Sequence, residues 1–148
     1  MTNFDKDKFL ASNNVYMYNP VAREDDKVIY LTFDVEWIRP DNVNIILDVI
    51  KEKNVSAAFF LIGYGIKKHA DIVRRIVSEG HITLNHTMNH VWLTKCTKDT
   101  IQRELEQCNQ QFYEVCGKEM PKAVRPPYGA INFRSQLLGM DIVGVDFS

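Results

Sequence analysis

Short apolar runs alternate with segments of helical periodicity along this chain, and that alternation limits the possible folds more than any other feature. Val28 to Phe33 is a run of β-favouring residues that ends at Asp34, and its length suits a buried parallel strand better than a helix. The next apolar residues recur at the spacing of one helical face: Val43, Ile46, Leu47 and Ile50. A second strand is predicted over Ser56 to Ile62. Strands that alternate with helices predict an α/β fold with a parallel sheet.

Two further helices and a strand are predicted in the middle of the chain. Ala70 to Glu79 makes a short helix with Gly80 as its C-cap, and His81 to Asn85 makes the third strand. A longer helix begins near Thr97 or Asp99, either of which can serve as its N-cap. Its apolar positions recur at steps of four and three residues: Ile101, Leu105, Cys108, Phe112 and Val115.

The last part of the chain repeats the pattern once more. A fourth short strand, Ala123 to Arg125, stops at two prolines that cannot extend a ladder of strand hydrogen bonds. A helix near Phe133 to Leu138 and a fifth strand over Ile142 to Val145 follow. Residues 1–27 are predicted to form a peripheral N-terminal arm and residues 28–148 a single domain.

Charge and cysteine content exclude several kinds of partner and site. Lys and Arg number 18 against 19 Asp and Glu, for a net charge of -1, so no basic surface is expected that could bind nucleic acid. The three cysteines have no C-x-x-C spacing, so neither a disulfide framework nor a thiolate zinc site is indicated. No apolar run is long enough for a membrane span, and the polar start Met1 to Phe9 predicts no signal peptide. For the chain as it stands these features favour a cytoplasmic location.

Polar side chains follow two of the predicted strands, where a parallel sheet places catalytic and binding groups. Asp34 and Glu36 leave the first strand two residues apart, although a turn-capping and a solvated carboxylate would give the same pattern. His86 and His90 lie four residues apart, a spacing at which two imidazoles on one helical turn can bind one metal. Two surface histidines are the alternative. A zinc protease is excluded, because H-E-x-x-H requires a glutamate where this chain has Thr87.

A third cluster follows the fourth strand. Arg125-Pro126-Pro127-Tyr128-Gly129 combines a stiff backbone with a guanidinium that can pair with a carboxylate, although by itself it could be an ordinary rigid loop. The chain has no G-x-S-x-G elbow, Walker loop or dinucleotide fingerprint. Metal-assisted hydrolysis is the chemistry that remains.

In this order, the segments T-F-D at Asp34, H-T-x-x-H at His86 and R-P-P-Y-G at Arg125 resemble the polysaccharide deacetylase family, also called the NodB homology domain. The resemblance runs from about Val28 to the end and looks closest to the branch that acts on peptidoglycan. It implies a (β/α) barrel of the seven-stranded NodB type, truncated at its C-terminal end, with about five strands present. It also implies a divalent metal, usually zinc, and an N-acetylated glycan as substrate.

The resemblance also implies roles for individual residues. Asp34 matches the catalytic base, and His86 and His90 match metal ligands. Arg125 matches the arginine that orients the base, and Tyr128 matches the residue whose backbone N–H helps to hold the oxyanion.

Two departures from the family pattern stand beside these matches. Most members have a second Asp, a metal ligand, directly after the base, where this chain has Val35. Glu36 is the candidate substitute, because it points to the same side of an extended segment as Asp34. The later Leu-x-His motif, which supplies the general acid, has no counterpart before Ser148.

Other residues beside the motifs have less specific interpretations. His81 is expected to be structural. Trp37 and Trp92, each just past a motif, are either sugar-stacking walls or core residues.

Three functions therefore stay open. The first is hydrolysis of N-acetyl groups on a peptidoglycan or chitin-like glycan, with a metal-bound water and Asp34 as base. The second is an amidohydrolase for a small non-sugar amide, which the lack of a signal peptide favours, although the family is often extracellular or attached to the cell wall. The third is a truncated, catalytically impaired glycan-binding copy, suggested by Val35 and the missing Leu-x-His.

The predicted strand count has a consequence for assembly. Five strands cannot close a barrel that needs seven, so the last strand should expose an unpaired edge and the apolar residues Ile142, Val143 and Val145. Self-association of the chain through this edge is therefore expected.

Overall fold

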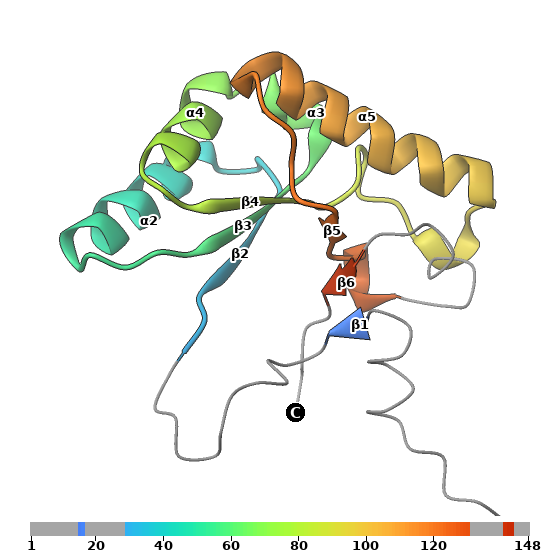
Figure 1. Cartoon of the computed structure of the whole chain (residues 1–148), viewed down its shortest axis with the longest axis horizontal. Coiled ribbons are helices and arrows are strands. Elements are labelled where there is room, and N and C mark those ends of the chain that lie inside the picture. The colour runs from blue at the N-terminus through green and yellow to red at the C-terminus, as the bar shows by residue number, and fades with distance from the viewer. Residues whose placement is uncertain (1–14, 17–28, 131–140, 144–148) are drawn as a thin grey trace, which may run out of the picture.

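The computed structural model describes residues 15–16, 29–130 and 141–143, with side chains described for 29–130. These residues form one parallel sheet with the strand order β1-β6-β5-β4-β3-β2 (Figure 1). Its strands are β1 (Val15–Tyr16), β2 (Thr32–Val35), β3 (Ala58–Leu61), β4 (Ile82–Asn85), β5 (Ala123–Val124) and β6 (Asp141–Val143). The α-helices are α2 (Pro40–Glu52), α3 (Gly63–Ile66), α4 (Ala70–Ser78) and α5 (Lys98–Cys116), and the 3-10 turns are η1 (Leu93–Lys95) and η2 (Pro127–Gly129).

The four α-helices lie together on one side of the sheet (Figure 1). Parallel strands need crossover connections, and α2 to α5 provide them between β2 and β5. The predicted alternation of strands and helices is therefore confirmed. Within the described part of the chain, no helix is both long and apolar enough to cross a membrane.

The parallel register brings the ends of four strands to one edge of the sheet. Val35 pairs with Leu61, Leu61 with Asn85, and Asn85 with Val124. The residues that follow these positions therefore leave the sheet side by side. The three polar clusters of the sequence lie at these strand ends or directly after them.

The first predicted strand starts later than expected. The ladder begins with Leu31, whose carbonyl accepts from the backbone N–H of Ala58, and β2 itself begins at Thr32. Ile29 and Tyr30, expected in a buried strand, are 85% and 65% exposed. The boundary is wrong because β3, the partner strand, starts only at Ala58.

The expected open edge at the last strand is wrong. β6 pairs with β5 on one side and with β1 on the other, through the pairs Val15 with Ile142 and Tyr16 with Val143. The stretch predicted as a peripheral arm thus contributes a strand, and the self-association expected from a bare β6 loses this support. Val145 and the helix predicted near residues 133–138 lie outside the described residues.

Local signals account for the two longest helices. α2 begins at Pro40 and buries the predicted apolar face, with Val43, Leu47 and Ile50 buried. Thr97 caps α5, since its hydroxyl accepts from the backbone N–H of Thr100 at 3.2 Å. Of the two N-caps expected, Thr97 is therefore the one used.

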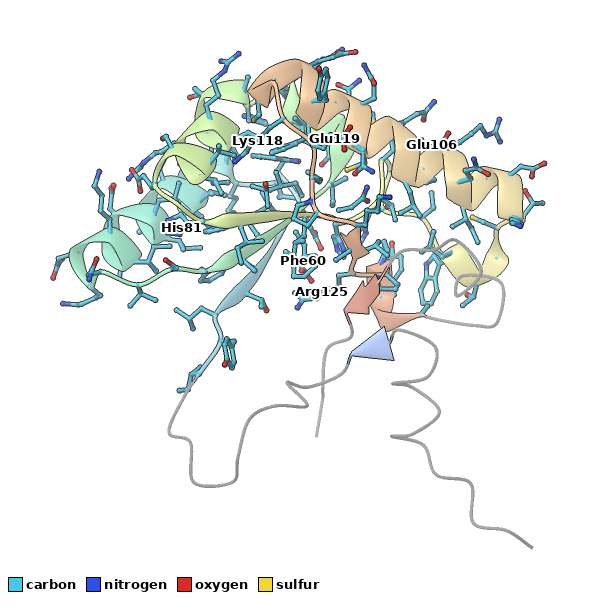
Figure 2. All side chains as sticks on the ribbon, in the orientation of Figure 1. Phe60, His81, Glu106, Lys118, Glu119 and Arg125 are labelled. Carbon is cyan, nitrogen blue, oxygen red and sulfur yellow. The ribbon has the colours of Figure 1, made fainter. Side chains whose placement is uncertain are left out.

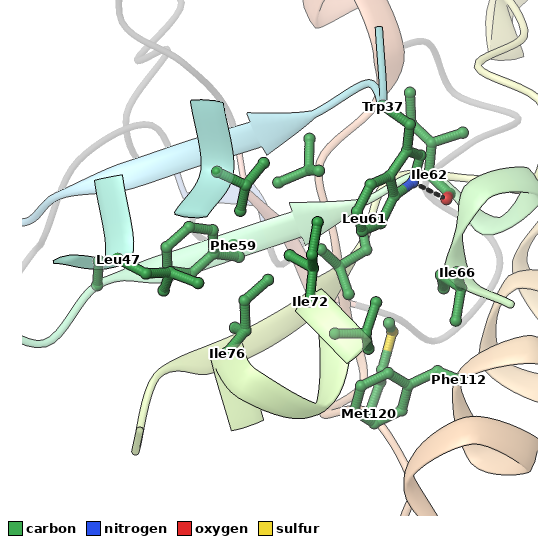
Figure 3. Close-up of a cluster of buried hydrophobic side chains, with 14 of the residues drawn as sticks. Trp37, Leu47, Phe59, Leu61, Ile62, Ile66, Ile72, Ile76, Phe112 and Met120 are labelled. Atoms are coloured by element: carbon green, nitrogen blue, oxygen red, sulfur yellow. Dashed lines mark hydrogen bonds between the residues drawn. The ribbon is translucent and has the colours of Figure 1, made fainter. Parts of the chain in front are cut away.

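The core lies between the sheet and the helices (Figure 3). Its fully buried side chains include Leu47, Phe59, Leu61, Ile66, Ile76 and Phe112. Trp37 belongs to it as well, being 7% exposed, and its indole N–H donates to the Ile62 carbonyl at 2.8 Å (Figure 3). Of the two interpretations of Trp37, core packing is confirmed.

Gly65→Ala is expected to destabilise the fold by about 3 kcal/mol, because overpacking a tight site costs roughly this much. A Cβ at Gly65 would overlap the indole ring of Trp37, which its hydrogen bond to Ile62 holds in place. Unfolding in urea measures the loss. Gly80→Ala is the control, since nothing lies within 4 Å of that position and only its positive φ of 84° opposes a side chain. Equal losses in the two variants would contradict the packing argument.

Candidate active site

The structure brings all six predicted site residues to one cavity of about 200 Å³. Its lining consists of Asp34, Glu36, His86, His90, Arg125, Pro126, Tyr128 and Gly129. They come from the ends of β2, β4 and β5 and from the loops that follow. The three motifs, which the sequence places at the ends of predicted strands, therefore lie together at one edge of the sheet.

Arg125 holds the carboxylate of Asp34 in place. Its Nη1 donates to Asp34 Oδ1 at 2.7 Å, and its Nη2 donates to Thr32 Oγ1 at 3.1 Å. The guanidinium also lies 3.8 Å above the ring centroid of Phe60 (Figure 2). Arg125 is only 5% exposed, so its orientation is restricted by packing and hydrogen bonds.

Alternation along β2 explains the T-F-D motif. Thr32 and Asp34 both reach Arg125, whereas Phe33 between them stacks on Phe59 in the core at 5.2 Å between ring centroids. Val35 continues the alternation and is buried in the core at 4% exposure.

The imidazole of His86 presents one free nitrogen to the cavity. Its Nδ1 lies 2.7 Å from the Arg125 carbonyl oxygen, which can only accept, so Nδ1 carries the proton. Nε2 is then left with a lone pair, 3.9 Å from Asp34 Oδ2. Burial lowers the pKa of His86 and outweighs the opposite effect of the Asp34 charge. The neutral imidazole is the form that binds metals.

His90 approaches His86 across a loop, so the predicted placement of both on one helical turn is wrong. Thr87 and His90 have positive φ angles of 67° and 54°, which no α-helix allows. The loop is closed by Asn85 Oδ1, which accepts from the Thr87 N–H at 2.7 Å, and by Thr87 Oγ1, which accepts from the His90 N–H at 3.0 Å. The two imidazole centroids still lie only 4.9 Å apart.

Glu36 lies on the same side of the chain as Asp34, as expected. Its Oε1 is 3.9 Å from His90 Nε2, and its side chain is 47% exposed. Glu36 and both histidines line the same cavity.

The donors around the cavity have the chemistry of a zinc site. Two imidazoles and two carboxylates are ligand types that zinc binds, and a backbone carbonyl that fixes the other ring nitrogen, as for His86, is the usual support of a metal-binding histidine. In residues 29–130, no group of three or more His, Cys, Asp or Glu side chains is arranged to hold a metal as it stands. The donors instead form two pairs, His86 with Asp34 and His90 with Glu36.

Tyr128 forms the rim of the cavity. It has a φ of 62° within η2, a conformation that a residue with a side chain adopts only when its surroundings hold it. Its ring stacks on Trp92, with 4.1 Å between centroids and 9° between planes, and lies 4.7 Å from the ring of His90. Trp92 is 43% exposed and thus belongs to this rim, not to the core.

His81 has no part in the cavity. It is 7% exposed, and its Nδ1 accepts from the backbone N–H of Ala57 at 3.4 Å. Burial lowers its pKa and favours the neutral ring. The prediction that His81 is structural is confirmed.

Sequence reasoning missed Asn85. This residue is fully buried, and its Nδ2 donates to the Leu105 carbonyl at 3.0 Å and to Asn109 Oδ1 at 2.8 Å. Its Oδ1 also accepts from the backbone N–H of Thr87. Asn85 therefore connects α5 with residues 86–90, here called the histidine loop. The sequence feature that could have identified Asn85 is an amide side chain at the end of an apolar strand, directly before His86.

Known proteins are similar to this chain in both sequence and fold. A chitooligosaccharide deacetylase from Rhizobium leguminosarum bv. trifolii is 42% identical over 111 residues, which are 75% of this chain and 51% of that protein. The peptidoglycan-N-acetylmuramic acid deacetylase PdaA of Bacillus subtilis is 37% identical over 107 residues, 72% of this chain and 40% of its own. The chain thus spans about half the length of the curated relatives it matches.

A solved structure is similar over almost the whole chain. A family 4 carbohydrate esterase from Bacillus anthracis superimposes with a TM-score of 0.81 at 32% identity, covering 96% of this chain and 68% of that one. This match confirms the predicted α/β fold of the NodB type. The sequence profile of polysaccharide deacetylases matches residues 22–142. Since that match covers most of the sequence and includes all three motifs, the chain belongs to the polysaccharide deacetylase family.

Proposed function

We propose that this chain carries a metal-dependent glycan N-deacetylase site, which hydrolyses acetamido groups of a peptidoglycan or chitin-like polymer. The observation that carries the proposal is the position of Asp34, which Arg125 holds at 2.7 Å and which faces the free Nε2 of His86 in one cavity. The names of the relatives, which are chitooligosaccharide and peptidoglycan deacetylases, support the substrate class.

His86 and His90 would hold the metal, and Glu36 would take the place of the acidic ligand that Val35 cannot provide. Zinc is the ion that this donor set favours. A metal held there supplies Lewis acid chemistry, since it polarises an amide carbonyl and lowers the pKa of water toward about 7.

The chain's own residues account for the proton transfer. Water attacks the carbonyl carbon of the acetamide and loses a proton to Asp34, whose Oδ2 is the oxygen not taken by Arg125 Nη1. Asp34 returns this proton to the nitrogen, and cleavage of the carbon–nitrogen bond then gives acetate and the free amine of the sugar. The ion pair with Arg125 keeps the carboxylate oriented before the proton arrives.

Tyr128 is proposed to stabilise the oxyanion through its backbone N–H. The left-handed conformation of this residue turns its peptide at the rim of the cavity, and the stacked ring of Trp92 keeps it there. A donor aimed at an oxyanion lowers the barrier by about 3 to 4 kcal/mol.

A glycan-binding protein without turnover is the second candidate function. It is favoured by the burial of Val35 in the core, at the position where most family members have an acidic ligand. Such a protein would bind the same polymers and release nothing.

Acetate release separates these functions. The zinc-loaded chain is incubated with chito-oligosaccharides, with peptidoglycan and with small N-acetylated amines that carry no sugar. Release from a glycan is the expected result, and a chelator should stop it. Release from the small amides alone would contradict the glycan substrate, and glycan binding without any acetate would favour the second function.

A further inference from the structure

Glu104 is a buried carboxylate that the proposed mechanism does not use. It lies on α5 and is 7% exposed. Its Oε2 accepts from the backbone N–H of Asn89 at 2.8 Å, and its Oε1 accepts from Asn89 Nδ2 at 2.8 Å. Both oxygens are thus bound by one residue of the loop, the residue directly before His90.

Burial of the Glu104 carboxylate has to be offset by interactions within the protein. Removing a charge from water costs free energy, and only well-placed hydrogen bonds offset that cost. Here both bonds come from Asn89, so the free energy that they supply acts on the histidine loop. A carboxylate is also the side chain best suited to this pair of donors, because both of its oxygens accept.

The loop needs such support because its backbone is unusual. Thr87 and His90 both adopt positive φ, a conformation that residues other than glycine rarely adopt. On one side the loop is held by Gly63 and Tyr64, whose backbone N–H groups donate to the carbonyls of Thr87 and Met88. On the side of α5, Glu104 holds Asn89.

The anchor lies next to the residue that has to be oriented. His90 is less restricted than His86, since its side chain is 21% exposed against 3%. Its backbone N–H is bound to Thr87 Oγ1, and the peptide that precedes it is bound through Asn89 to Glu104. Movement of Asn89 would therefore change the direction in which the His90 ring leaves the chain.

We propose that Glu104 is a positioning residue that, through Asn89, sets the direction of the His90 ring toward the cavity and so prepares the metal site. This inference rests on the proposed function, because it requires His90 to be a metal ligand. Glu104 itself touches neither metal nor substrate.

Glu104→Gln tests the proposal by zinc affinity, measured in competition with a chromophoric chelator. The glutamine offers one acceptor to two donors, so one of the Asn89 bonds is lost. The dissociation constant for zinc should rise about 10- to 100-fold, the usual effect of losing a group that supports a metal ligand. The control is Glu106→Gln, the same chemical change at an exposed position of the same helix (Figure 2), and it should leave the affinity unchanged.

Hydrogen exchange of the metal-free chain gives a second readout. The backbone amide of Asn89 should exchange faster in Glu104→Gln than in Glu106→Gln, because a neutral amide oxygen that two donors compete for replaces its carboxylate acceptor. A merely structural role of Glu104 would lower the unfolding midpoint and leave the zinc affinity of the folded protein unchanged. That result would overturn the inference.

A second variant decides the case if Glu104→Gln does not fold. Asn89→Ala removes the amide that binds Oε1 and keeps the backbone N–H that binds Oε2. Asn89 is exposed, so the fold should tolerate the change, and a smaller loss of zinc affinity is expected. Unchanged affinity in this variant would overturn the inference. A wild-type chain that binds no zinc would instead overturn the proposed function, and the inference with it.

Discussion

Asp34→Asn is expected to lower the rate of acetate release at least about a hundredfold while zinc stays bound. A positioned general base contributes about 10²- to 10⁴-fold, and an amide cannot accept the proton. The amide oxygen can still accept from Arg125 Nη1, whose bond to Asp34 is 2.7 Å long, so the site should keep its shape. Initial rates of acetate release and the zinc content of the same samples measure the two effects.

The control for Asp34→Asn is Asp71→Asn, which makes the same change at an exposed position in the first turn of α4. This variant should release acetate at the wild-type rate. Unchanged release in Asp34→Asn would remove Asp34 from the mechanism. Loss of zinc from the same variant would make Asp34 a ligand in place of a base.

Replacement of both His86 and His90 by Ala is expected to abolish zinc binding. The Nε2 atoms of these residues face the two carboxylates of the cavity at 3.9 Å, so the double variant removes every imidazole donor from the cavity lining. Metal content after dialysis is the measurement, with circular dichroism as the test of folding. Equal metal content in the wild type and the double variant would contradict the site.

Two further variants make the metal experiment more specific. His69→Ala removes a histidine outside the cavity, one that stacks on Trp37 at 5.1 Å, and should not change the zinc content. Glu36→Gln tests whether this carboxylate replaces the acidic ligand missing at Val35. A weaker zinc affinity is expected, and an unchanged affinity would leave the two histidines without the third ligand proposed.

Much of the fold could be predicted because its signals are local. The buried face of α2 follows from the spacing of Val43, Leu47 and Ile50, and the start of α5 follows from one hydroxyl, that of Thr97. The pairing of β1 with β6 could not be predicted. Two residues carry no periodicity, and β1 is a strand only because β6 offers hydrogen-bonding partners far along the chain.

The site shows the same division between local and distant information. Motif spacing identified six residues of the cavity, but it gave His86 and His90 the wrong backbone, because a spacing of four fits a tight loop as well as a helical turn. Trp92 had two interpretations in the sequence. Only its contact with Tyr128 places it at the rim.

By itself, the sequence determined the order of the strands β2 to β5 and of the helices α2, α4 and α5, the residue types of the site and the family. Periodicity, capping and motif order are properties of neighbouring residues. The tertiary structure decided how those residues act together. The ion pair of Arg125 with Asp34 joins residues 91 positions apart, and the hydrogen bonds between Glu104 and Asn89 connect a helix with a loop. Contacts of this kind depend on how elements pack, and no local pattern in the chain records them.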